Sequence, residues 1–136
     1  MSAITQSLGP SLLVALGGGI GAVGRYQLGR AVTHWAGPNT GFPWSTLSAN
    51  VIGSLAMGLL VGWLAHRGGA GSETVRLLLG VGLLGGFTTF SAFGLDAAKL
   101  FDAGHPGRGA WYVGLSVLGG IAGAWIAMRL AGGRLE

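Results

Sequence analysis

The sequence contains no cysteine and very few charged side chains, and both absences narrow what the protein can be. Without cysteine, disulfides and thiolate chemistry are excluded. Only 9% of the residues are charged, whereas about a quarter are charged in soluble domains. Half of the chain is hydrophobic, which predicts an integral membrane protein. The net charge of +4 then indicates anchoring at the membrane surface and no binding of nucleic acid.

Four apolar stretches are long enough to cross a bilayer, which takes about 20 residues. We expect the spans at about residues 9–30, 44–65, 75–98 and 108–131 of one domain that covers residues 1–136. No basic residue precedes Arg25, so the first stretch is not typical of a cleaved signal peptide. Glycines at four-residue spacing predict close helix packing in several spans: Gly17 and Gly21, Gly58 and Gly62, Gly82 and Gly86, Gly119 and Gly123. The sequence therefore predicts an all-α membrane protein with four transmembrane helices.

The eight Lys and Arg residues divide equally between the two ends of the expected spans. One end has Arg25, Arg30, Lys99 and Arg108, and the other has Arg67, Arg76, Arg129 and Arg134. The positive-inside rule therefore favours neither orientation, and such a chain is able to insert both ways and pair as an antiparallel dimer. The alternative is that a small protein shows this balance by chance.

The third span contains an irregular segment, with two glycines, three hydroxyls and three phenylalanines between residues 85 and 93. Glycine is unfavourable in a helix interior, and Thr and Ser compete for backbone hydrogen bonds, so we expect a break at residues 85–89 within the membrane. In a bilayer, non-helical backbone is tolerated only where it is buried in protein or lines a polar cavity. This segment therefore indicates an ion or substrate site, unless Thr88 and Thr89 are only caps of the second half-helix.

Polar side chains recur near this break. Asn50 has Thr46 one turn before it, and Ser116 follows Tyr112 by one turn in the fourth span. Asn50 either links two helices or donates hydrogen bonds along an anion path, and the broken span nearby favours the second interpretation.

Phe90 and Phe93 share a helix face. They either pack against lipid and core or turn the positive edges of their rings toward an anion. Arg25 either extends to the membrane surface or draws anions toward the protein. His34, His66 and His105 are scattered, and the acidic residues form no acid–base pair, so an enzyme is not predicted.

Three segments resemble the Fluc (CrcB) family of fluoride channels: residues 17–26 (GGGIGAVGRY), 46–53 (TLSANVIG) and 85–91 (GGFTTFS). The resemblance implies passive, fluoride-selective export through two pores of a dual-topology, antiparallel homodimer in a bacterial inner membrane. It also implies a structural sodium ion at the dimer interface. A small multidrug or cation exchanger is the main alternative, but it needs a carboxylate deep in the membrane. A membrane scaffold protein is another alternative, which leaves the broken span unexplained.

By motif, the resemblance implies a fluoride pathway formed by six residues: Asn50, Phe90, Phe93, Thr46, Tyr112 and Ser116. It implies that the backbone carbonyls of Gly85 and Thr88 hold the sodium ion, and that Arg25 has a vestibule or structural role. The family usually has Thr and Ser around the second phenylalanine and a Glu three residues after it. This sequence has Ala92, Gly94 and Asp96 there, so Asp96 keeps the charge at a possible ion entrance on a shorter stem.

Overall fold

The structure, a computed structural model, describes residues 3–38, 40–67 and 70–132, and all regular structure in these ranges is helical. Three long helices are continuous: α1 (Ala3–Ala36), α2 (Trp44–Leu64) and α6 (Pro106–Leu130). The third hydrophobic stretch is divided into four helical segments, which are α3 (Ala70–Val75), the π-helix η1 (Arg76–Leu84), α4 (Gly85–Phe87) and α5 (Phe90–Asp102).

Four segments are long and apolar enough to cross a membrane: Leu8–Ala36, Trp44–Leu64, Gly71–Asp102 and Pro106–Leu130. This confirms the prediction of an all-α membrane protein with four long apolar helices. The first helix runs to Ala36 instead of ending near residue 30, so the connection to α2 is shorter than expected. Gly37 and Gly41 have positive φ angles of 88° and 62° in this connection, which a residue with a Cβ atom rarely adopts. Arg134 lies outside the described residues.

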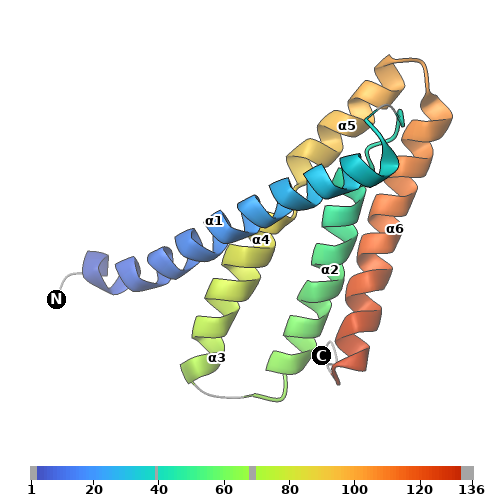
Figure 1. The fold of residues 1–136 in the computed structure, drawn as a ribbon. Coiled ribbons are helices and arrows are strands. Elements are labelled where there is room, and N and C mark those ends of the chain that lie inside the picture. Colours follow the sequence, from blue (N-terminus) through green and yellow to red (C-terminus); the bar gives the residue numbers. More distant parts are fainter. Residues whose placement is uncertain (1–2, 39, 68–69, 133–136) are drawn as a thin grey trace.

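The helices α2 and α6 run side by side in the same direction, and α1 crosses the other helices obliquely (Figure 1). Glycine allows the close approach of α2 and α6, because a Cβ atom on Gly58 would overlap the carbonyl oxygen of Ala124. A Cβ atom on Gly62 would lie 2.6 Å from the carbonyl oxygen of Met128, one turn farther along both helices. Such small-residue faces are typical of helices that pack in lipid.

A second glycine contact joins α1 to the third span. A Cβ atom on Gly17 would overlap the carbonyl oxygen of Leu78, and one on Gly21 would overlap that of Leu83. A Cβ atom on Gly86 would similarly overlap the carbonyl oxygen of Gly18. Backbone therefore lies directly against backbone along this interface, as the four-residue glycine spacing predicted.

The third span departs from the expected form in two ways. Its segment η1 is a π-helix, for which the local sequence shows no evident cause. The break is narrower than the expected residues 85–89, since Gly85 has α-helical angles (φ −63°, ψ −39°). Only Thr88 (φ −83°, ψ 161°) and Thr89 (φ −153°, ψ 120°) are extended. Glycine flexibility is therefore not the direct cause of the break.

A small core lies between α2, α5 and α6. It contains Leu47, Ala97, Leu100 and Tyr112, with Phe42 and Phe93 packed against it. Many large apolar side chains elsewhere are exposed in the protomer, as is expected of a surface that faces lipid or a partner; examples are Leu16, Trp111, Leu118 and Leu130.

Candidate functional site

The break in the third span is held by the side chain of Asn50 on α2. The Asn50 Nδ2 donates to the carbonyl oxygen of Thr89 at 2.9 Å, and the Thr89 amide donates to Asn50 Oδ1 at 2.8 Å. One side-chain amide thus pairs with the Thr89 N–H, which donates outside the helical ladder here, and adds a donor to the Thr89 carbonyl, the N-cap carbonyl from which α5 begins. An amide group has two N–H donors, so one Asn50 donor remains for another acceptor. Asn50 therefore links two helices, which is one of the two interpretations drawn from the sequence. It also keeps one N–H donor for a ligand, as the other interpretation requires.

The hydroxyl groups of the two threonines complete the break. The Thr88 Oγ1 donates to the Leu84 carbonyl oxygen at 3.0 Å and so closes the end of α4. The Thr89 Oγ1 accepts from the Ala92 amide at 3.2 Å, which makes Thr89 the N-cap of α5. The interpretation of Thr89 as a cap is confirmed, while Thr88 belongs to the preceding helix end.

These same hydrogen bonds leave two carbonyl groups without their helical partners. In a continuous helix, the Thr89 amide would donate to Gly85 and the Ala92 amide would donate to Thr88. Here those amides donate to the side chains of Asn50 and Thr89. Within the described residues, no other backbone amide outside the regular helical ladders donates to either carbonyl oxygen. Both oxygens are therefore available to a hard cation, which prefers oxygen ligands.

A groove of about 520 Å³ lies beside the break. We call it the α2–α6 groove, and it is lined by Asn50, Gly53, Ser54, Met57, Thr88, Thr89, Phe90, Phe93, Ser116, Val117, Gly120, Ile121 and Ala124. It brings together four of the six residues predicted for the pathway, from three different spans. Gly53 allows this arrangement, because a Cβ atom there would overlap the methyl group of Thr88.

The two phenylalanines differ in their surroundings. Their ring centroids are 5.5 Å apart with an interplanar angle of 43°. The Phe90 side chain is 84% exposed in the protomer, whereas Phe93 is half-buried against the ring of Tyr112, with 5.4 Å between centroids. Phe93 is therefore fixed by the core, and Phe90 extends from the protomer.

Two hydroxyl groups of α6 are buried and have no hydrogen-bond partner within the described residues, namely Tyr112 Oη and Ser116 Oγ. Leaving a buried polar group unpaired costs about 1 to 3 kcal/mol, so such a group suggests a missing ligand. Ser116 lines the α2–α6 groove, whereas Tyr112 lies in the core beside it. The Tyr112 hydroxyl is in the neighbourhood of Thr46 and Asp96, but its geometry to both falls short of a hydrogen bond.

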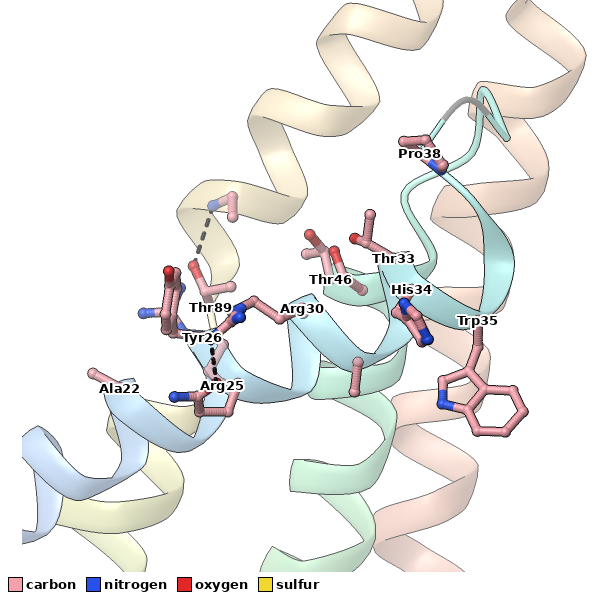
Figure 2. Close-up of a pocket in the computed structure, with 15 residues that line it drawn as sticks. Ala22, Arg25, Tyr26, Arg30, Thr33, His34, Trp35, Pro38, Thr46 and Thr89 are labelled. Atoms are coloured by element: carbon pink, nitrogen blue, oxygen red, sulfur yellow. Dashed lines mark hydrogen bonds between the residues drawn. The ribbon is translucent and has the colours of Figure 1, made fainter.

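The structure places Thr46 away from this groove. Its Oγ1 donates to Asp96 Oδ2 at 2.7 Å, and it lines a second groove of about 1120 Å³ beside α1. Figure 2 shows this α1 groove, to which Arg25, Arg30 and His34 also contribute. The Arg25 Nε donates to the carbonyl oxygen of Gly86 at 3.4 Å and so ties α1 to the segment before the break. A vestibule role and a structural role were suggested for Arg25, and this contact gives it a structural role.

The prediction from sequence missed Ser54 and Gly120, which line the α2–α6 groove one turn beyond Asn50 and Ser116. A signal was present for Ser54, since it follows Asn50 by four residues and must share its helix face. Gly120 had no such signal, because glycine spacing in α6 is explained by helix packing alone.

The fold and the groove define a multi-pass α-helical membrane protein with an interrupted third span beside a largely apolar groove that holds a few polar groups. The family described as "CrcB-like protein, Camphor Resistance (CrcB)" matches residues 12–128. A relative from Novosphingobium aromaticivorans, called "Fluoride-specific ion channel FluC", is 53% identical over 88% of this chain and 94% of its own. Proteins of the same description from Phenylobacterium zucineum and Sphingopyxis alaskensis are 51% and 50% identical over 88% and 86% of this chain and 95% and 90% of theirs. The chain belongs to the CrcB family.

Proposed function

We propose that this protein is a fluoride-selective channel that works as an antiparallel homodimer in a bacterial inner membrane and lets fluoride leave the cytoplasm passively. The relatives carry the name of a fluoride-specific ion channel and cover nearly the whole chain. The observation that carries the proposal is the α2–α6 groove, where a free amide donor, an unpaired hydroxyl and two aromatic rings meet. Neither conduction nor selectivity requires a catalytic group, so the protein is not an enzyme.

The groups in the groove suit a small anion. Moving an ion of carboxylate size into a low-dielectric medium carries an idealised cost of order 20 kcal/mol, so many donors are needed. The remaining Asn50 N–H, the Ser116 hydroxyl and the ring edges of Phe90 and Phe93 supply such donors without a full positive charge. An ion held this way is stabilised but not trapped, which conduction requires. Tyr112, through its contact with Phe93, fixes the position of one ring.

An antiparallel dimer is supported by charge and by exposure. In the sequence, the basic residues assigned to the two ends of the spans balance, with Arg25, Arg30, Lys99 and Arg108 against Arg67, Arg76, Arg129 and Arg134. Neither orientation is then favoured by the positive-inside rule. The exposed Phe90 ring lines a groove that is open in the protomer, so a second copy is well suited to close it. One such groove per protomer would give two pores per dimer.

The free carbonyl groups of Gly85 and Thr88 support a sodium site at the dimer interface. Two oxygens from each protomer would surround the ion, and both are left without helical partners by the break itself. When bound, a sodium ion supplies a fixed positive charge between two anion paths. Asn50 and the Thr89 side chain are the groups that hold these carbonyls free.

The exchanger alternative is less well supported by the site. Such a protein binds its cationic substrate with a carboxylate inside the membrane. The Asp96 carboxylate accepts a hydrogen bond from Thr46 and does not line the α2–α6 groove. Asp96 then has a vestibule or structural role on the side of Thr46.

Ion efflux from liposomes that contain the purified protein tests the proposal. We expect rapid fluoride release with little chloride release, measured with ion-selective electrodes. Replacing Phe90 or Phe93 with Ile should slow fluoride efflux about two- to tenfold, because a ring contact is worth about 0.5 to 1.5 kcal/mol beyond area burial. Phe101→Ile is the matched control, since this α5 ring lies outside the groove. Equal leak of both ions, or none, would refute the channel, and full flux in both ring variants would remove the rings from the path.

Cysteine labelling tests dual topology in cells, because the sequence has no cysteine of its own. Gly71→Cys and Gly107→Cys place a thiol at opposite ends of the spans, at positions with nothing within 4 Å of an added Cβ atom. For each variant, an impermeant maleimide should label about half of the molecules from outside and the rest only after permeabilisation. A single orientation would instead give complete external labelling of one variant and none of the other.

A further inference from the structure

The α2–α6 groove continues past Asn50 and Ser116 to a second level. On α2, Ser54 follows Asn50 by one turn, and on α6, Gly120 follows Ser116 by one turn. The two helices run side by side in the same direction (Figure 1). The one-turn steps on the two helices therefore bring Ser54 and Gly120 to the same level. A Cβ atom on Gly120 would lie 3.3 Å from Ser54 Oγ. The second level thus combines a hydroxyl group with the absence of a side chain opposite it.

The Ser54 hydroxyl is available to a ligand. It makes no hydrogen bond within the part of the chain that the structure describes, although the residue is half-buried. It is distinct from the hydroxyls of Thr88 and Thr89, which bond to backbone groups of the break. Serine inside an apolar helix commonly bonds to the carbonyl group one turn earlier, and Ser54 does not. An unpaired donor in a groove lined by apolar groups such as Met57, Val117 and Ile121 is expected to bind a passing acceptor.

We propose that Ser54 is a fluoride-binding residue of the pathway and that Gly120 provides the space for the ion at its level. The inference rests on the proposed channel function and extends its path by one helical turn, about 5.4 Å. An ion leaving the level of Asn50 and Ser116 is then received by the Ser54 hydroxyl before it reaches the apolar end of the groove at Met57 and Ala124. Successive weak sites of this kind allow an anion to move without being trapped at any one of them.

Substitution of Ser54 tests this role. Ser54→Ala removes the donor and should lower fluoride efflux about tenfold, the effect expected when a charged acceptor loses one hydrogen bond. Ser54→Thr keeps the hydroxyl and should retain most of the flux. Ser48→Ala is the matched control on the same helix, because Ser48 does not line the groove. A Ser54→Ala protein with the flux of the Ser48→Ala control would refute the role of Ser54.

Gly120 is tested separately, since an added methyl group would occupy the space opposite Ser54. Gly120→Ala should slow fluoride efflux by about tenfold or more, while Gly114→Ala, with nothing within 4 Å of its added Cβ atom, should not. All variants are compared by gel filtration, so that loss of assembly is distinguished from loss of conduction. If Gly120→Ala conducts like Gly114→Ala, the ion does not pass at this level. If the wild type released no fluoride, the proposed channel function would be overturned. If the wild type conducted and the Ser54→Ala and Gly120→Ala proteins conducted like their controls, only the proposed role of the second level would be overturned.

Discussion

Replacing Asn50 with Ala is expected to abolish fluoride efflux and to destabilise the protein. The substitution removes both hydrogen bonds to Thr89, so the Thr89 amide loses its partner and the Thr89 carbonyl loses one of its donors. The unsatisfied amide costs about 1 to 3 kcal/mol and the lost bond to the carbonyl about 0.5 to 1.5 kcal/mol, which gives a loss of roughly 1.5 to 4.5 kcal/mol in the free energy of unfolding. The pathway loses its amide donor as well, so flux should fall by at least about a hundredfold.

Efflux from liposomes and thermal unfolding in detergent measure the two effects. Asn50→Asp tests the donor, because the carboxylate still accepts from the Thr89 amide but lacks an N–H donor and carries a negative charge. Its second oxygen would face the Thr89 carbonyl oxygen, so this variant should also conduct poorly and be less stable than the wild type. Gln27→Ala is the control for loss of a side-chain amide, since the Gln27 side chain lies on α1 and, among the residues described, bonds only to the exposed Arg30 side chain. Wild-type flux in Asn50→Ala would refute the role of Asn50 as a donor in the pathway, and unchanged thermal unfolding would refute its role in holding the break.

Gly21→Val is expected to prevent the third span from packing against α1. The added Cβ atom would overlap the carbonyl oxygen of Leu83 and lie 2.8 Å from the amide nitrogen of Phe87. These are backbone atoms, which cannot rotate away as a side-chain end can. The destabilisation should therefore exceed about 3 kcal/mol, the upper end for ordinary overpacking.

The matched control is Gly19→Val, two residues away on the same helix, where nothing lies within 4 Å of an added Cβ atom. Both substitutions introduce the same β-branched residue into α1, so differences in helix propensity cancel. Gel filtration and limited proteolysis of the purified proteins should show folded protein for Gly19→Val and little or none for Gly21→Val. Equal yields of folded, active protein would contradict the close contact between α1 and η1.

Much of the fold follows from composition and periodicity. Low charge and four long apolar stretches require helices that satisfy their own backbone groups, since lipid offers no hydrogen bonds. The helical path between residues 76 and 89 was less predictable. Gly85 is helical although its propensity suggested a break, because packing of the neighbouring Gly86 against Gly18 holds this segment in place. The π-helix of η1 has no local pattern that predicts it.

The candidate site, like the fold, was predictable from the sequence only in part. Residue type and spacing of three or four residues, together with the family resemblance, predicted Asn50, Phe90, Phe93 and Ser116 as pathway residues, because spacing depends only on one helix face at a time. The sequence by itself determined that the protein crosses a membrane and that the polar groups collect near residues 85–93. Only the tertiary structure decided which of those groups share a cavity. It paired Thr46 with Asp96, committed Asn50 to the Thr89 peptide and placed Ser54 opposite Gly120. These relations depend on the register between helices, which is set by contacts between distant parts of the chain.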